Sequence, residues 1–460
     1  MQFHLGKPIL VMMVIALISA VVIARREPQR RADLDLWVFA DAHYKAYDPL
    51  VRQYEKDHGV TINLNAVVMR AMNVRLASLF MTNPSSPDLP DLVEVEVGSI
   101  GRYFRAPLED VGFIPLNGFL KESGWYDQVV EQRFAPYTKD GVIFGVPHDI
   151  HPNTITYRHD LFWGVERPDG TLDGPGIDLS QAKTWPEFHE ACLKFRDYWK
   201  GRVRYRHAIE LPESAIDYVM VMLQQRGINL VDDKNKLYFT DPRVADTVAF
   251  YAQMVAGPRK VSGQSTGGQG PFAKDVGDGN ICAFITADWR VTYIKRFSEH
   301  LSGHMRMMPL PIFEPGDKPT GSWGGTMIGI TKGCENPKEA WRLIEWLYFS
   351  KAGLAARRKH SDVLPPVKSL WDDPVYHQPD PYFGGQKADE LFISLARQIP
   401  VRYVTPATGM AQTALNSVLA KATDYVRTRG SEGLEEACQA WLIQVERDLH
   451  DRMMHMRFDE

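Results

Sequence analysis

Apolar and polar residues alternate near the start of the chain in a pattern that predicts a β-strand. In LDLWVFAD, residues 34–41, the apolar Leu34, Leu36 and Val38 fall on every second position. A period of two places these side chains on one face of an extended strand. We therefore expect a strand here with one face packed on a core.

A helix, a second strand and a second helix are expected next. In DPLVRQYEKDHG, Asp48 can cap a helix, Pro49 suits its first position and Gly59 suits its C-terminal stop. Residues 60–68, VTINLNAVV, have the character of a strand, and residues 69–82, MRAMNVRLASLFMT, that of a helix.

A third strand follows in PDLPDLVEVEVGSIG. Val93, Val95 and Val97 face one side, and Glu94 and Glu96 face the other. The order strand, helix, strand, helix, strand predicts a parallel sheet wrapped by helices.

Ligands of such sheets bind beyond the carboxyl ends of the strands. This rule selects Phe39, Ala40 and Asp41 after the first strand, and Glu96 to Ser99 after the third.

The rest of the chain predicts a second lobe. Residues 139–162 read as a hairpin, a proline-containing loop and a strand that crosses to it, and residues 163–183 as a surface loop. Residues 215–257 are helical in pattern with one break, and residues 261–270, VSGQSTGGQG, form a flexible loop without the ending of a phosphate-binding loop. MRMMPLPI, which starts at Met305, is expected to be a strand that returns to the first lobe.

Composition narrows the class of protein. A chain of 460 residues with 44% hydrophobic and 24% charged residues should fold into roughly two or three domains. A net charge of −4 with mixed signs argues against nucleic acid as a partner. The four cysteines have no C-x-x-C spacing, which excludes zinc ribbons and thioredoxin-like chemistry but leaves one disulfide open; we expect Cys192 and Cys438 in the core.

The N-terminus carries an uncharged apolar run from Pro8 to Ala24, which predicts an export signal or a membrane anchor. Val22 and Ala24 suit a signal-peptidase cleavage site. The arginines that follow oppose cleavage, and by the positive-inside rule they also oppose an orientation with the rest of the chain outside the cytoplasm. No cysteine near the end of the run provides a lipid anchor.

No assembled catalytic set is found. Glu94 and Glu96 share one face of one strand and cannot flank a scissile bond, so Glu96 is either a binding residue or part of solvated or salt-bridged structure. His148, Asp149 and His151 have the donor types of a metal site, but beside two prolines they favour a hydrogen-bonded loop, so we expect no metal and no cofactor. The nucleophile elbow, H-E-x-x-H and G-x-G-x-x-G motifs are absent, which favours a protein that is not an enzyme.

Aromatic residues suggest a binding site instead. In ICAFITADWRVTY, residues 281–293, Trp289 is either a core plug with Arg290 paired to Asp288, or the wall of a site. Aromatic rings beside Gly, Asp or Arg at the ends of elements suit sugar rings and their hydroxyls; such positions are Phe39, Trp289, Trp323 and Tyr382.

Together these segments resemble the extracellular solute-binding proteins of carbohydrate ABC importers, the family 1 or maltose-binding-protein-like group. The resemblance covers roughly residues 33–425 and rests on LWVFADAHYKAYDPLVRQYEKDHG, PDLPDLVEVE, DGVIFGVPHDIHPNTITYRHDLF, KTWPEFHEA, GNICAFITADWR, PLPIFEPG, GSWGGTMIGITKG and PKEAWRLIEWLYFS, in that order. It implies an α/β, two-lobed, periplasmic-binding-protein-like fold of type II, in which each lobe is a mixed sheet wrapped by helices and ligand binds in the cleft between lobes. Hinge closure on binding is also implied.

The resemblance also implies domain limits and a site. Residues 1–32 would be a signal or anchor with a basic spacer, 33–151 and 306–350 the first lobe, and 152–305 and 351–460 the second. The cleft residues carried over are Phe39 to Asp41, Trp289 with Arg290, and Trp323 to Gly325.

We therefore expect a monomeric receptor outside the cytoplasm, anchored or released, that passes a sugar to the transmembrane subunits of an ABC permease. Phe39, Trp289 and Trp323 would stack on the sugar, while Asp41, Glu96, Asp149 and Arg290 would bond its hydroxyls; the other site residues expected are Ala40, His148, Gly324, Gly325 and Tyr382. The alternatives are a receptor for a polyamine or peptide, with an acidic or basic cleft, and a carbohydrate-active enzyme with two opposed carboxylates.

Overall fold

The computed structural model describes Met12 and residues 32–214, 216–265 and 268–456. Apart from Met12, the apolar run at 8–24 lies outside the described residues. Within the described part of the chain, none of the helices combines the length and the apolar character that a membrane span needs.

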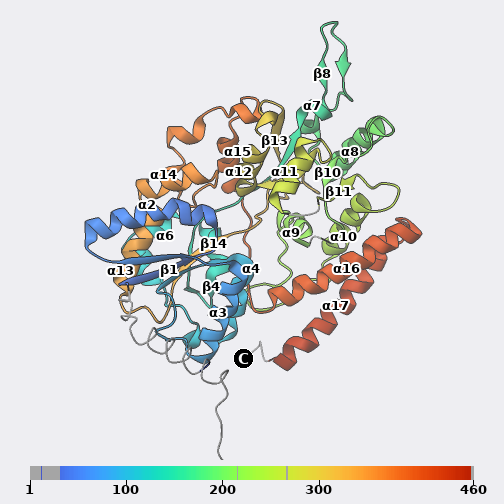
Figure 1. The fold of residues 1–460 in the computed structure, drawn as a ribbon. Coiled ribbons are helices and arrows are strands. Elements are labelled where there is room, and N and C mark those ends of the chain that lie inside the picture. The colour runs from blue at the N-terminus through green and yellow to red at the C-terminus, as the bar shows by residue number, and fades with distance from the viewer. Residues whose placement is uncertain (1–11, 13–31, 215, 266–267, 457–460) are drawn as a thin grey trace, which may run out of the picture.

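Two five-stranded sheets form the centres of two lobes (Figure 1). The first sheet contains, in spatial order, β2 (Ile62–Ala66), β1 (Leu34–Val38), β3 (Leu92–Glu96), β14 (Thr326–Ile330) and β6 (Val146–Pro147). The second contains β11 (Ser262–Gly263), β10 (Ile209–Glu210), β12 (Ala283–Ala287), β7 (Asn153–Arg158) and β13 (Met305–Pro309). Both sheets combine parallel and antiparallel pairs, which confirms the predicted two-lobed mixed α/β architecture.

Helices cover both faces of each sheet. The first lobe is covered by α2 (Asp41–His58), α3 (Met69–Thr82), α13 (Pro337–Ile344), its π-helical continuation η7 (Glu345–Phe349) and α14 (Lys351–His360). The second is covered by α8 (Trp185–Trp199), α9 (Ile216–Gln225), α10 (Pro242–Val255), α11 (Gln269–Gly277), α12 (Asp288–Phe297) and α15 (Ala388–Ala396), with α16 (Thr408–Arg429) and α17 (Leu434–Met456) as a long pair on its outside (Figure 1). A small hairpin, β8 (Val165–Glu166) and β9 (Leu172–Asp173), projects from this lobe (Figure 1).

The predicted alternation in β1 and β3 is confirmed. Leu34, Leu36 and Val38 pack with α2 in one core, whereas Trp37 packs with α3 on the opposite face. β1 is parallel to both β2 and β3, so the carboxyl ends of β1 and β3 lie at the same edge of the sheet. The valines of β3 face the α3 core, and Glu94 points to the α2 side.

The predicted start of α2 is wrong. The helix begins at Asp41, so Pro49 lies inside it and Asp48 is not its cap. The extra turns are stabilised because Ala46 and Tyr47 are buried on the sheet and Asp41 pairs with Lys45 one turn later. Gly59 ends the helix with φ 69°, as expected of a left-handed C-terminal residue.

The placement of the strand at Met305 also needs correction. β13 pairs antiparallel with β7, and Met305 and Met307 fill the core beneath α12 and α15, so this strand belongs to the second sheet. The chain returns to the first sheet only at β14. Conversely α14, expected in the second lobe, packs on α2.

All four cysteines are buried. Cys192 and Cys438 belong to the core of the second lobe, as predicted, and the disulfide left open by the sequence is not formed.

Candidate functional site

Two segments that join the lobes lie side by side. Pro152, which follows β6, pairs with Ser322, which precedes β14. Asn153 N donates to Gly321 O over 3.2 Å. These paired crossings place residues 148–152 and 320–325 between the two sheets.

A cavity of about 220 Å³ opens beside the crossings on the second lobe. Its walls come from the carboxyl end of β10, from α9, from the loop before α11 and the start of that helix, from α12, which directly follows the carboxyl end of β12, and from the crossing segment. The lining residues are Glu210, Tyr218, Ser265, Gly268, Gln269, Phe272, Trp289, Arg290, Tyr293 and Trp323. The site therefore lies where ligands of α/β sheets bind.

Aromatic rings are fixed against one another in this cavity. The Trp289 and Trp323 rings meet edge to face with centroids 5.3 Å apart, and the Tyr218 ring lies 5.1 Å from Trp323. Trp289 Nε1 donates to the Trp323 carbonyl over 3.2 Å. Both tryptophans are half-buried and line the cavity.

Arg290 is held within the cavity wall. Its guanidinium donates to Glu210 Oε2 over 2.8 Å and to Ile285 O over 2.8 Å, and it lies 3.9 Å from the centre of the Phe272 ring. Burial acts against its charge, but Tyr218 and Glu210 raise its pKa overall. The ion pair with Asp288 considered from the sequence does not form, because Asp288 bonds His151.

A buried polar network lies under the crossings. His151 sits between two carboxylates, with Nδ1 2.5 Å from Asp288 Oδ1 and Nε2 3.1 Å from Asp149 Oδ2. Burial opposes its charge, but these two carboxylates raise the pKa of His151 to about 10. Arg133 adds a second cation, 3.1 Å from Asp149 Oδ1.

Asp149 and His148 therefore do not face the cavity. Asp149 is fully enclosed, and its carboxylate accepts from Arg133 and from Thr326 N while contacting both histidines. A carboxylate with these partners has no free position for a sugar hydroxyl, which corrects the expected role of Asp149. His148 is equally buried and turns toward His43 in the first lobe.

Close packing around the crossing segment requires glycine at positions 324 and 325. Both have positive φ, 91° and 140°. A Cβ on Gly325 would lie 2.4 Å from Arg133 Nη2, and one on Gly324 would lie 3.4 Å from Trp289 Nε1. Only glycine allows the crossing segment to pass between the buried network and the cavity.

Gly325→Ala is expected to lower the free energy of unfolding by more than the ~1–3 kcal/mol that an unfavourable φ alone costs, because the new methyl group also overlaps Arg133. Chemical denaturation measures the loss. Gly385→Ala is the matched control, since Gly385 has φ 84° and no atom of the described residues lies within 4 Å of its Cβ position. Equal losses in the two variants would contradict the packing argument.

The first-lobe residues expected at the site lie at one edge of their sheet but outside this cavity. Phe39 is half-buried, and its ring lies 5.9 Å from that of His43. Ala40 precedes α2, and Asp41 is exposed and paired with Lys45. Glu96 Oε2 accepts from Gly98 N over 2.8 Å, and burial raises its pKa.

Tyr382 was expected in the ligand site, and this prediction is wrong. Its side chain is buried in the core beneath α12, and its hydroxyl donates to Ile294 O and Ser298 O. It is a core residue of the second lobe.

Sequence reasoning missed several cavity residues. Tyr293 follows Trp289 by one helical turn and could have been found from that spacing. Ser265, Gly268 and Gln269 belong to the glycine-rich segment 261–270, for which the sequence predicts a flexible loop. Tyr218 and Phe272 carry no local signal, because only the tertiary fold brings them there.

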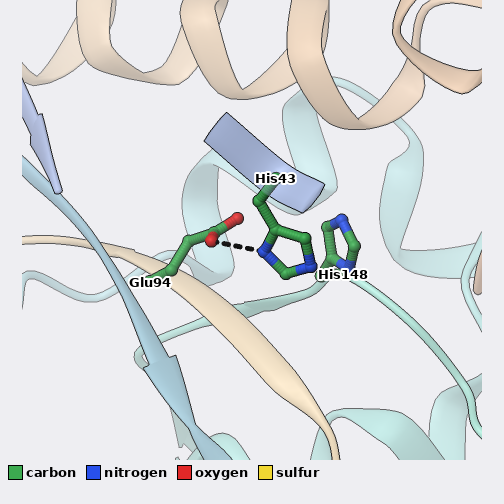
Figure 2. A group of neighbouring side chains, drawn as sticks. All are labelled: His43, Glu94 and His148. Atoms are coloured by element: carbon green, nitrogen blue, oxygen red, sulfur yellow. Dashed lines mark hydrogen bonds and ion pairs between the residues drawn. The ribbon is translucent and has the colours of Figure 1, made fainter. Parts of the chain in front are cut away.

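One further group in the described residues has the donor types of a metal site. His43, Glu94 and His148 each offer a ligand atom, and these atoms lie within 4.8 Å of one another (Figure 2). The other group considered from the sequence, His148, Asp149 and His151, is occupied by other contacts. Asp149 pairs with Arg133, and His151 pairs with Asp288.

Comparisons with known proteins agree on one class. The sequence pattern described as bacterial extracellular solute-binding protein matches residues 49–382. The chain is 23% identical over 384 residues to the arabinooligosaccharide-binding protein of Halalkalibacterium halodurans, covering 80% of this chain and 79% of that protein. It is 21% identical over 371 residues to the protein of the same description from Bacillus subtilis, covering 79% and 80%.

Solved structures show the same fold. The sugar-binding protein MalE of Xanthomonas citri matches with a TM-score of 0.69 and 19% identity, over 93% of this chain and all 100% of that one. The ABC transporter associated binding protein of B. animalis subsp. lactis, in complex with β-1,6-galactobiose, matches with a TM-score of 0.65 and 19% identity, over 90% and 97%.

Proposed function

Because this chain belongs to the bacterial extracellular solute-binding proteins, we propose that it captures an oligosaccharide in the aromatic cavity and delivers it to an ABC permease. The observation that carries the proposal is the set of fixed rings, Trp289, Trp323 and Tyr218, around a cavity beside the lobe crossings. Its support comes from two relatives described as arabinooligosaccharide-binding proteins and from solved neighbours that bind sugars.

The chemistry of the cavity suits a sugar ring. Aromatic faces bury the apolar C–H surface of a sugar, and polar side chains at the rim bond its hydroxyls. Gln269 and Ser265 supply such groups. Arg290 is already anchored to Glu210, so its main task is to hold the Phe272 and Trp323 walls in place.

The size of the cavity suits one end of the ligand. A volume of about 220 Å³ is smaller than the ~300–1,000 Å³ of sites that enclose a drug-sized ligand. An oligosaccharide would place one unit among the rings and extend toward Phe39 and Glu96 on the first lobe. The closing of one lobe on the other would then complete its enclosure.

Family membership places the chain outside the cytoplasm. We further propose that residues 8–24 hold it at the inner membrane, that it acts as a monomer and that it catalyses no reaction on its ligand.

A thermal-shift screen of the full chain tests the ligand class. Arabino-oligosaccharides, galactobiose and malto-oligosaccharides are compared with polyamines and short peptides, in EDTA. A ligand that binds only the folded state at 100 times its Kd adds about 2.7 kcal/mol of stability, so a sugar that binds should raise Tm by several degrees. A shift with a polyamine or peptide and with no sugar would overturn the proposal.

A further inference from the structure

Three potential metal ligands meet inside the first lobe, away from the cavity. His43 comes from α2, Glu94 from β3, and His148 from the segment after β6 (Figure 2). Glu94 and His148 are 0% and 1% exposed, and the His43 side chain is 13% exposed. Segments far apart in the sequence thus converge on one small buried volume.

The carboxylate of Glu94 is positioned by two hydroxyls. Oε1 accepts from Tyr47 OH over 3.0 Å and from Tyr348 OH over 2.7 Å. Oε2 is turned the other way and lies 2.7 Å from His43 Nδ1 (Figure 2). One carboxylate oxygen is therefore fixed by the protein, and the other faces the imidazoles.

His148 presents an unpartnered nitrogen in this group. Its Nδ1 lies 3.3 Å from Asp149 Oδ2, and an ionised carboxylate only accepts, so Nδ1 carries the proton and donates it. Nε2 then bears the lone pair, and this buried atom has no hydrogen-bond partner among the described residues. A buried acceptor without a partner is destabilising, and histidines that bind metals characteristically donate their other N–H to a carboxylate.

We propose that His43, Glu94 and His148 bind a divalent transition cation of the zinc type. Two imidazoles and one carboxylate match the donor set of Zn²⁺ and Co²⁺, whereas Mg²⁺ and Ca²⁺ prefer oxygen ligands alone. Bonds of about 2.0–2.2 Å require the ligand atoms, now within 4.8 Å of one another, to approach by small side-chain movements. Binding would replace the direct bond between His43 and Glu94.

The site would serve the architecture of the first lobe. It would join α2, β3 and the segment that leads to the lobe crossing, and the partly exposed edge of His43 would admit the ion. His148 also contacts Asp149 of the buried network, so the ion would be tied to the crossing through that hydrogen bond. The proposal does not depend on the identity of the solute.

Cobalt titration tests the site directly. The full chain, purified without a polyhistidine tag and treated with EDTA, is titrated with Co²⁺ and then with Zn²⁺. We expect one Co²⁺ per chain with the visible absorption of a low-symmetry site, and its loss as Zn²⁺ displaces Co²⁺. His43→Ala should weaken Co²⁺ binding by at least ~100-fold, beyond the ~10–100-fold effect of losing an outer-shell contact.

His377→Ala is the matched control. His377 lies 3.0 Å from Glu390, a similar contact to that of His43 with Glu94, but both side chains are more than a third exposed. This variant should bind Co²⁺ like the parent. Absence of the absorption in the parent, or equal binding in the parent and His43→Ala, would overturn the proposal.

The partly exposed His43 is the decisive position, because Glu94→Gln could impair folding by disturbing two buried tyrosines. Far-UV circular dichroism and the melting temperature in EDTA establish that His43→Ala is folded. Because EDTA removes free metal ions from the sugar screen, that screen tests sugar binding alone. The metal proposal and the sugar proposal can therefore fail independently of each other.

Discussion

Replacing Arg133 with methionine is expected to lower the free energy of unfolding by about 3–5 kcal/mol, the usual effect of removing one partner of a buried ion pair. Arg133 is 2% exposed and donates to the Asp149 carbonyl over 3.0 Å, to Asp149 Oδ1 over 3.1 Å and to Ser322 Oγ over 3.0 Å. Methionine keeps much of the volume and leaves all three acceptors without this donor. Urea denaturation followed by far-UV circular dichroism measures the change.

The loss should be large because Arg133 binds both chain crossings at once. Asp149 belongs to the segment that leaves the first sheet, and Ser322 to the segment that returns to it. His151 remains beside Asp149, but it is shared with Asp288 and does not replace the missing guanidinium.

Arg52→Met is the control for loss of an arginine charge. Arg52 pairs with Asp48 one turn earlier on the surface of α2, with its own side chain 73% exposed. Such an exposed pair contributes little to stability, so this variant should be nearly as stable as the parent. Similar losses in both variants would show that the buried network does not stabilise the crossings.

The regular part of the fold could be predicted because it depends on local periodicity. The alternation of Leu34, Leu36 and Val38 and the stop of α2 at Gly59 are encoded within a few residues, and the structure contains both. The start of α2 was wrong because the signal of Asp48 and Pro49 is local, whereas the burial of Tyr47 on the sheet is not. That error removed His43 from the helix and hid its approach to Glu94.

The candidate site could be predicted only in part, for a related reason. Trp289 and Trp323 stand out at the ends of strands and do line the cavity. The partners of Asp149 and Arg290 come from distant segments, so the sequence could not show that their polar groups are already occupied. Tyr382 has neighbours in the sequence like those of the predicted site residues, yet its hydroxyl donates to backbone carbonyls in the core.

Trp289→Ala is expected to weaken binding of the sugar selected by the thermal screen at least tenfold, which corresponds to about 1.4 kcal/mol. The substitution removes one aromatic wall of the cavity and leaves the Trp323 carbonyl without its donor. Because Trp289 is half-buried and its ring contacts Trp323 edge to face, the melting temperature should fall by only a few degrees. Isothermal titration calorimetry measures the affinity.

Two matched variants separate a binding wall from a packing residue. Trp163→Ala removes a partly exposed tryptophan beside the projecting hairpin and should leave affinity unchanged, because Trp163 is not among the cavity residues. Tyr382→Phe removes a buried hydroxyl and should reduce stability without reducing affinity. If Trp289→Ala instead behaves like Tyr382→Phe, losing stability while binding the sugar like the parent, Trp289 supports the second lobe and the sugar must be bound by other residues.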